Sequence, residues 1–478
     1  MKKYLALPLL IILCSSCNKQ LIEKPKSFLS PNQFFKSDDE ARQAANGAYA
    51  TAFYMYGGMG GAVDLGYWSL GTDIAVSTTT GTYTFRDYTM SASAIGSLQN
   101  TWTNLYKGVA NCNMVISGVT DNANISEAAK KEVLGQSLFL RSLYYYMLTC
   151  FWGDVPMWLN ALNVDEIGGH IPRTPVDSVR QQMIKDLKVA AADLPPVWTG
   201  SDLGRASKWA AEMLMCHVYL WQKDWADAMA VAQEIIENKG GNNHLLADYG
   251  DIWGEANEYN AEDIWELDFT QNTHPSKLTD RYIPRQVDEP VIPGYNLTGF
   301  GLLTSTPEFL ATFEPGDLRK PWYDWHGNGT ITTHYHYVLK QTNNINELRT
   351  NSGLNSIVYR MADAYLMYAE AANELNGPTD DAYEKINVIR KRAGLPGLSG
   401  LSQEQFRQAI MDERKWELSF EFQRRWDLNR WGKLVEAVKS NAASNPEGAK
   451  NVRSYHQLCP IPPKEIALNP ALTQNPGY

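Results

Sequence analysis

Apolar residues recur every three to four positions along most of the chain, which is the spacing of an amphipathic helix. Segments with this spacing lie at about residues 41–56, 97–120, 126–151, 175–193, 206–222, 224–237, 361–376, 381–393 and 402–437. Ser37 stands before the first of them and is followed by three acidic residues. Serine caps helix N-termini and acids favour the first turn, so a helix is predicted to begin there.

Two long stretches interrupt this helical pattern. Residues 57–95 are rich in Gly, Thr and Ser, and residues 240–355 mix turn residues with runs of alternating polarity such as 264–269. Alternating polarity predicts short strands, and loops of this length are usually functional or mobile. The predicted fold class is therefore all-α, with two long loop-rich insertions that bear short strands.

The helices occur in pairs. Residues 206–237 read as two helices joined by a turn at Lys223-Asp224, and residues 361–393 repeat this arrangement. Each unit is close to the roughly 34 residues of a tetratricopeptide repeat. A helical hairpin of this size cannot bury its apolar face alone and must stack on its neighbours. A scaffold of tetratricopeptide-like helix pairs is predicted, with a generic bundle of helical hairpins as the alternative.

The N-terminus has the pattern of a bacterial export signal. The chain begins Met-Lys-Lys, and the apolar run of residues 4–13 is shorter than the roughly 20 residues that span a bilayer. Two serines then precede Cys17, which resembles a lipoprotein signal in which the cysteine thiol receives a diacylglyceryl group. We predict a lipoprotein signal peptide over residues 1–16 and a lipid anchor at Cys17. The alternative is an ordinary cleaved secretion signal.

No Gly-, Ser- or Pro-rich linker divides the rest of the chain. A single domain is therefore predicted over residues 17–478. It comprises an N-terminal helical part at about 17–240, the loop-rich insertion at about 240–355, and a C-terminal helical part at about 356–478.

Charge and cysteine content exclude several functions. The net charge is −10, which disfavours nucleic-acid binding because phosphate recognition needs clustered Lys and Arg. Four cysteines lie beyond residue 17, at a spacing that fits neither a zinc site nor a disulfide scaffold. His334 and His336 share one strand face without a third ligand, so they are interpreted as surface histidines. We predict no metal and no cofactor.

Six motifs along the chain resemble the SusD/RagB family of nutrient-binding lipoproteins. They are FLRSLYYY (139–146) with FWGDVP (151–156), GRASK (204–208), YRMADAYLMYAEA (359–371), INVIRKRAG (386–394), DERKWELSFE (412–421) with RWDLNRWG (425–432), and PIPPKEI (460–466) with QNPGY (474–478). Each motif alone is weak, but six in the right order are specific. The sequence departs from the family at Phe422, where the family usually has Gly.

The resemblance implies a fold, a partner and a location. The fold would contain four tetratricopeptide-like helix pairs. The partner would be a SusC-like TonB-dependent transporter barrel, over which the lipoprotein sits as a hinged lid. The protein would lie at the extracellular face of the outer membrane and bind an oligosaccharide without breaking a bond.

The charged residues within these motifs are interpreted as structural. Glu413, Glu417 and Glu421 recur every four residues on one predicted helix face, among residues of opposite charge. Such a stripe usually stabilises a helix or ties it to another one. Pairing between helices is likewise predicted for Arg360, Glu370 and Arg390.

Aromatic residues in the two insertions are the candidate ligand contacts. The chain has 15 Trp and 25 Tyr, and aromatic walls with a few directed polar groups are typical of binding sites. The best candidates are Trp322, Tyr323 and Trp325 beside a Gly-rich turn, and Asp73 and Arg86 are the best polar ones. The full set of predicted contacts is Trp68, Asp73, Tyr83, Arg86, Tyr295, Trp322, Tyr323 and Trp325. The alternative for each aromatic residue is a loop anchor packed on the helices.

The predicted function is capture of a glycan and its delivery to the transporter. A first alternative is a peptide ligand, as in RagB-like members, held by pairing at a strand edge. A second is a secreted glycoside hydrolase; no motif suggests one, but the separation of two carboxylates is a tertiary property. A third is a plain tetratricopeptide adaptor, which leaves the aromatic insertions unexplained.

Overall fold

The computed structural model describes most of the chain. The described residues are 35–58, 65–77, 84–90, 92–161, 170–238, 245–282, 301–325, 336–341 and 351–478. The predictions for Cys17, Tyr83, Tyr295 and His334 fall outside these ranges. Within them, no helix combines the length and apolar character that crossing a bilayer requires.

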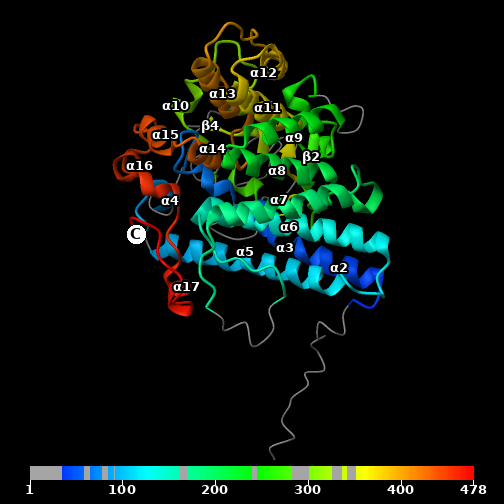
Figure 1. Cartoon of the computed structure of the whole chain (residues 1–478). Coiled ribbons are helices and arrows are strands. Elements are labelled where there is room, and N and C mark those ends of the chain that lie inside the picture. The colour runs from blue at the N-terminus through cyan, green and yellow to red at the C-terminus, as the bar shows by residue number, and fades with distance from the viewer. Residues whose placement is uncertain are drawn as a thin grey trace, which may run out of the picture.

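Antiparallel helices stacked in series form the scaffold (Figure 1). The Ser37 side chain caps the first of them by accepting a hydrogen bond from the Glu40 backbone nitrogen, as predicted. From α5 to α9 each helix packs against the next, and α9 packs on α11. The N-terminal members are α2 (Asp38–Ala48), α3 (Ala50–Tyr56), α5 (Ala92–Val119), α6 (Glu127–Trp152), α7 (Val176–Asp193), α8 (Lys208–Gln222) and α9 (Trp225–Asn238).

The C-terminal helices continue the series. The predicted pairs are confirmed as α8 with α9 and as α11 (Met361–Asn376) with α12 (Asp380–Arg392), in a tetratricopeptide-like arrangement. Lys223 ends α8 in the left-handed region at φ 59°, which forms the predicted turn. The remaining helices are α13 (Gln403–Leu418), α14 (Arg424–Arg430), α15 (Leu434–Ser440), α16 (Pro446–Asn451) and α17 (Pro463–Leu468).

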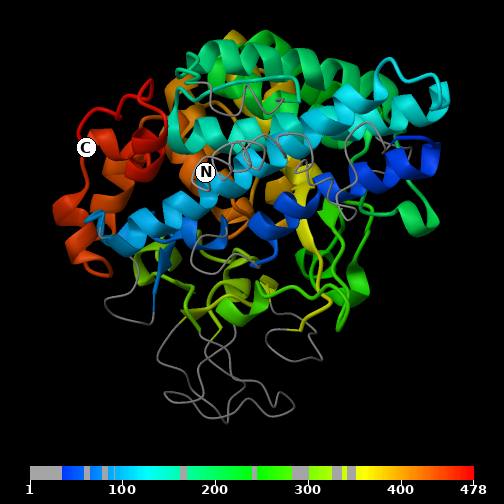
Figure 2. The same cartoon turned by 90° about the horizontal axis from the view of Figure 1, so that it is seen from below.

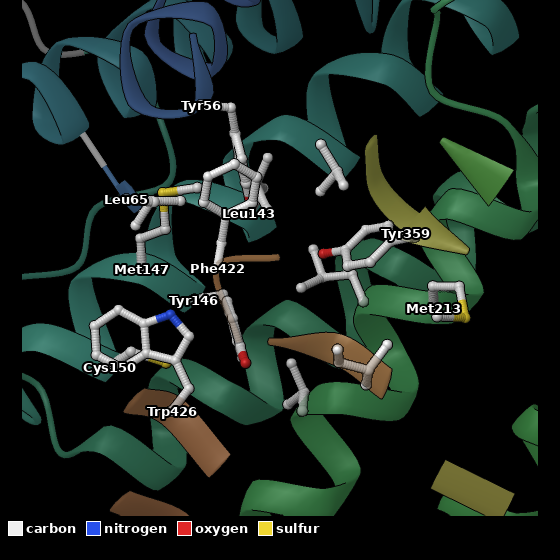
Figure 3. Close-up of a cluster of buried hydrophobic side chains, with 14 of the residues drawn as sticks. Tyr56, Leu65, Leu143, Tyr146, Met147, Cys150, Met213, Tyr359, Phe422 and Trp426 are labelled. Atoms are coloured by element: carbon white, nitrogen blue, oxygen red, sulfur yellow. The ribbon is translucent and has the colours of Figure 1, made fainter. Parts of the chain in front are cut away.

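The single helix predicted over residues 402–437 is wrong, because the chain breaks after Leu418. Phe420 and Phe422 adopt φ angles of 64° and 70° in the left-handed region. Glycine enters that region without strain, which gives a physical reason for the glycine that the family usually has at position 422. In this chain the Phe422 ring is buried against Tyr56, with ring centroids 5.1 Å apart, and this packing offsets the strain (Figure 3).

The insertions form two small sheets. The predicted strand near 264–269 is confirmed as β2 (Asp263–Leu267), which pairs antiparallel with β5 (Ser356–Arg360). A second sheet has the order β1 (Ala75–Val76), β3 (Thr304–Ser305) and β4 (His336–Tyr337). Short helical segments complete the insertions and linkers: α4 (Thr84–Asp87), α10 (Pro307–Leu310), and 3-10 turns at Leu65–Ser69, Gly200–Asp202, Tyr249–Ile252, Glu255–Asn257, Thr279–Arg281, Lys320–Trp322, Leu339–Gln341 and Ser454–Gln457.

The main hydrophobic core surrounds the second half of α6. Every residue from Phe139 to Trp152 is buried. Figure 3 shows side chains from α6, α8, β5 and the α13–α14 connection meeting in this core, so it joins the N-terminal and C-terminal helical parts. The cysteines at 112, 150, 216 and 459 are free and buried. They therefore act as small apolar residues.

The C-terminal tail, residues 459–478, covers the end of α6. The Cys459 backbone nitrogen donates to the Phe151 carbonyl oxygen at 2.7 Å. The Trp152 indole nitrogen donates to the Pro460 carbonyl oxygen at 3.0 Å, and Asn475 Nδ2 donates to the Trp152 carbonyl oxygen at 3.1 Å. The tail thus satisfies polar groups that the helix end would leave without partners.

A buried ion cluster holds the C-terminal part together. The Glu417 carboxylate on α13 forms ion pairs with three guanidinium groups. The nitrogen–oxygen distances are 3.0 Å to Arg319, 2.6 Å to Arg360 and 2.5 Å to Arg392. The four side chains are between 0% and 4% exposed. These arginines come from the second insertion, the end of β5 and the end of α12. One carboxylate therefore ties three separate segments to one helix.

The other acidic residues of the motifs pair in the same way, as predicted. Each of these buried carboxylates bonds directly to a cation, which offsets the cost of removing the charge from water. The pairs are Glu413 with Arg319 and Arg390, Glu421 with Arg360 and Lys340, and Glu370 with Arg430.

Candidate functional site

The sheet β1–β3–β4 brings the two loop-rich insertions together. Ala75 of the first insertion pairs with Ser305 of the second, and Thr304 pairs with Tyr337. Residues 65–77, 301–325 and 336–341 therefore form one contiguous region with both buried and exposed side chains, named here the loop face. Figure 2 shows the second insertion gathered on one side of the helical layers. Loops carried by a rigid scaffold are a usual place for binding residues.

Trp325 is a half-buried aromatic residue at the edge of this sheet. Its backbone nitrogen donates to the Tyr337 carbonyl oxygen at 3.2 Å, and the Tyr337 backbone nitrogen donates to the Trp325 carbonyl oxygen at 3.1 Å. The two rings meet edge to face with centroids 6.4 Å apart. Its neighbour Asp324 pairs with His336 Nδ1 at 2.6 Å, and both side chains are 25% exposed. The sheet edge thus carries a half-buried indole and, one position away in sequence, a partly exposed Asp–His pair.

Trp322 lies in a different cluster. Its ring is half-buried against Tyr249, with centroids 6.2 Å apart, and it adjoins the buried Ile252 and Trp253. A Cβ atom at Gly250 would lie 2.8 Å from the Trp322 ring, so a glycine is needed there. Trp322 and Trp325 are three positions apart in sequence, yet the structure packs them with different partners.

Tyr323 cannot present a ring to a ligand, which corrects the prediction. The side chain is fully buried at 0% exposure. Its hydroxyl group bonds to that of Tyr249 at 2.8 Å and accepts a hydrogen bond from Lys340 Nζ at 3.1 Å. Burial raises the Tyr323 pKa well above its usual value. Tyr323 is therefore a core residue that anchors the second insertion on α13.

Trp68 requires the same correction, because it is 3% exposed. Its ring packs against Phe151 and Phe85, with centroids 4.4 and 4.8 Å apart, and stacks on Trp426 at 6.3 Å. Both faces of the indole are thus occupied by protein. Trp68 anchors the first insertion to the main core, which is the alternative interpretation for the loop aromatics.

The two polar candidates hold ion pairs of their own. Asp73 accepts two hydrogen bonds from Arg424, at 2.9 and 2.6 Å. Burial alone would raise the Asp73 pKa, but Arg424 outweighs it and the net shift is downward. Arg86 pairs with its neighbour Asp87 at 2.7 Å. The Asp73 side chain is 13% exposed and borders a cavity of about 170 Å³ next to Trp431.

Sequence reasoning missed the pairing of His336 with Asp324. The available signal was the alternation of His and Tyr over residues 334–337, which predicts a strand but does not indicate which segment that strand pairs with. Among the described residues, no cluster of three or more His, Cys, Asp or Glu side chains is arranged to hold a metal ion. His336 instead directs one ring nitrogen at a carboxylate.

Comparisons with known proteins agree on one family. Residues 317–478 match the model described as the SusD family, and residues 72–220 match the model described as starch-binding associating with outer membrane. The chain is 33% identical to SusD-like protein P25 of Formosa agariphila, over 98% of both chains.

Solved structures share the whole architecture. A SusD homolog from Bacteroides thetaiotaomicron superposes with a TM-score of 0.81 at 23% identity, covering 94% of this chain and 98% of that one. Surface glycan-binding protein A from the same organism, solved in complex with laminarihexaose, has a TM-score of 0.78 at 21% identity, covering 92% and 99%. At such identities the likeness concerns the fold.

Proposed function

This chain belongs to the SusD family, and from that premise we propose that it captures an oligosaccharide at the bacterial outer membrane without breaking a bond. The observation that carries the proposal is that the half-buried Trp325 and the partly exposed Asp324–His336 pair lie on the same short segment of the loop face. A family model described as starch-binding and a relative in fold bound to laminarihexaose support a glycan as the ligand.

The binding mode follows from the chemistry of a pyranose ring. Its apolar C–H face packs on the exposed part of the Trp325 indole, and its hydroxyl groups exchange hydrogen bonds with Asp324 and His336. Such a combination of an apolar wall with a few directed polar groups gives orientation as well as affinity. Trp322, Asp73 and Arg86, with Tyr83 and Tyr295 in the same insertions, remain proposed secondary contacts.

The variant Trp325→Ala tests this site. We expect the dissociation constant for the best oligosaccharide on a glycan array to rise at least tenfold, about 1.4 kcal/mol, because the stacking platform is lost. Isothermal titration of the lipid-free protein measures it. Trp221→Ala is the matched control, since Trp221 is also half-buried but lies on α8. Equal affinities of both variants and the unmodified protein would remove Trp325 from the site.

The same preparation tests the absence of catalysis. Incubation with the bound oligosaccharide should release no new reducing ends. Sustained turnover would favour a glycoside hydrolase over a binding protein.

Attachment and partner form the second half of the proposal. Cys17 is the proposed acceptor of lipid, and a SusC-like TonB-dependent transporter is the proposed recipient of the ligand at the extracellular face. More than one acyl chain anchors a protein stably, whereas one chain binds a membrane only marginally. Intact mass spectrometry of the membrane-extracted protein should give a chain that begins at Cys17 and carries several acyl groups. A chain with a free N-terminal thiol would contradict the anchor.

A further inference from the structure

We propose that the protein has a second sugar-binding site, which takes a single neutral sugar ring. The site is a cavity of about 220 Å³ between the α7–α8 linker, residues 196–209, and the segment 259–266 that leads into β2. We name it the linker pocket. None of its lining residues belongs to the loop face, so it does not depend on the Trp325 site.

The walls of the linker pocket are aromatic and held in place. The Trp198 indole nitrogen donates to the Ala206 carbonyl oxygen at 2.9 Å, and that of Trp265 donates to the Gly204 carbonyl oxygen at 3.0 Å. At the rim, Val197 is 61% exposed. Trp265 is buried at 3% exposure, so it fixes the wall from behind, whereas the half-buried Trp198 ring next to exposed apolar surface is the feature that a sugar ring covers with its C–H face.

The pocket contains a buried donor without an acceptor. Trp209 is 3% exposed, and its indole nitrogen has no hydrogen-bond partner among the described residues. A buried donor of this kind destabilises the protein unless something accepts from it. Trp209 lines the pocket, so a bound ligand could supply the acceptor.

Two carboxyl groups line the same pocket because β2 is irregular. In a regular strand, residues three apart point to opposite faces. The register of β2 shifts between Asp263 and Trp265 and again between Trp265 and Glu266. Bulges of this kind redirect side chains. As a result Asp263 and Glu266 both border the cavity.

This combination selects a neutral hydroxylated ligand. A hydroxyl group accepts a hydrogen bond from the Trp209 indole and donates one to a carboxyl group, whereas an ammonium group cannot accept. An anionic ligand would be repelled by the Asp263 carboxylate, whereas burial and the nearby Asp263 raise the pKa of Glu266 well above its usual value and favour its neutral form. The cation that borders the pocket, Arg205, already bonds Asp202 at 2.7 Å and Asn46 at 2.6 Å.

The volume sets the size of the ligand. Pockets for drug-sized molecules span about 300–1,000 Å³, so about 220 Å³ suits one ring rather than a chain. The linker pocket would therefore hold a terminal or branching sugar unit.

Saturation-transfer NMR on the Trp325→Ala protein tests the linker pocket separately from the loop face. The probes are glucose, galactose, mannose and N-acetylglucosamine, with glucuronate and tetramethylammonium as charged probes. We expect at least one neutral sugar to give a signal. Trp209→Phe keeps an aromatic ring but removes the donor, so it should weaken binding of that sugar at least fivefold. Trp198→Ala should weaken it further.

A second readout separates a binding role from a structural one. Because the Trp209 donor has no acceptor in the free protein, Trp209→Phe should not lower the Tm without sugar. Binding of a neutral sugar that is weakened at least fivefold in both variants, with the Tm maintained in Trp209→Phe, supports the proposal. No signal from any neutral sugar, a signal that both variants retain, or a signal from a charged probe alone overturns it. The test uses single sugars and the Trp325→Ala protein. Its outcome therefore does not depend on whether the unmodified protein binds an oligosaccharide at the loop face.

Discussion

Replacing Glu417 by Gln should lower the free energy of unfolding by about 3–5 kcal/mol, as expected when one partner of a buried ion pair is removed. Glutamine has nearly the same shape, so the change removes charge and little packing. Arg319, Arg360 and Arg392 all bond this carboxylate, and their side chains are at most 4% exposed. Without it, three cations remain inside the protein with one fewer counter-charge.

Urea denaturation followed by circular dichroism measures this effect. Glu436→Gln is the matched control, because Glu436 pairs with Lys433 at the surface, where the two side chains are 72% and 43% exposed. Exposed pairs contribute at most about 1 kcal/mol, so the control should barely shift the transition. If the two variants lost the same small amount, the cluster would not be what ties α13 to its neighbours.

Stability should pass through a maximum near pH 5 and fall steeply in acid. The pKa values of Asp73, Asp363, Glu417 and Asp427 are lowered, since their arginine partners, together with His217 at Asp363, outweigh the effect of burial. A carboxyl group with a lowered folded pKa stabilises the protein above its unfolded value, near 4, and this contribution is lost as the pH falls. Each such group contributes about 1.4 kcal/mol for each unit of its shift.

Other carboxyl groups act in the opposite direction at higher pH. Burial raises the pKa of Glu212 to about 7 and that of Glu258 to about 7. A carboxyl group with a raised folded pKa binds its proton more tightly in the folded protein than in the unfolded chain. The free energy of unfolding should therefore increase as the pH falls from 8 through 7 and these groups become protonated. Urea midpoints measured between pH 8 and pH 3 test both slopes. Glu212→Gln should flatten the upper slope and Glu417→Gln the acid one, and midpoints that are constant across the range would contradict both assignments.

The helical scaffold could be predicted from the sequence because the signals that begin and end a helix lie within the helix or next to it. Ser37 caps the first helix, and Gly153 ends α6 at φ 72°, as the sequence Trp152-Gly153 indicates. The break after Leu418 escaped prediction because Phe420 and Phe422 are apolar residues that fit a helical pattern. Their left-handed backbone is stabilised by tertiary packing, which no local pattern records.

The candidate site was harder to predict for a related reason. Aromatic residues in loops serve either as ligand platforms or as anchors, and their sequence neighbourhoods look alike. Tyr323 and Trp325 are two positions apart, yet the first is fully buried and the second is half-buried. What separates them is the pairing of residue 325 with Tyr337 and the packing of Tyr323 on α13, both of which depend on distant segments.

The C-terminal tail has a consequence for the order in which the chain folds. Helices α5 to α9 contact their sequence neighbours, so they can assemble once about 240 residues exist. Contacts between residues far apart in sequence form more slowly because a large loop must close first. The end of α6 lacks its cover until residues 459–475 have been synthesised, some 300 positions later. The incomplete chain can therefore hold α5 to α9 together while the end of α6 stays uncovered, and the fold is finished only when these residues arrive.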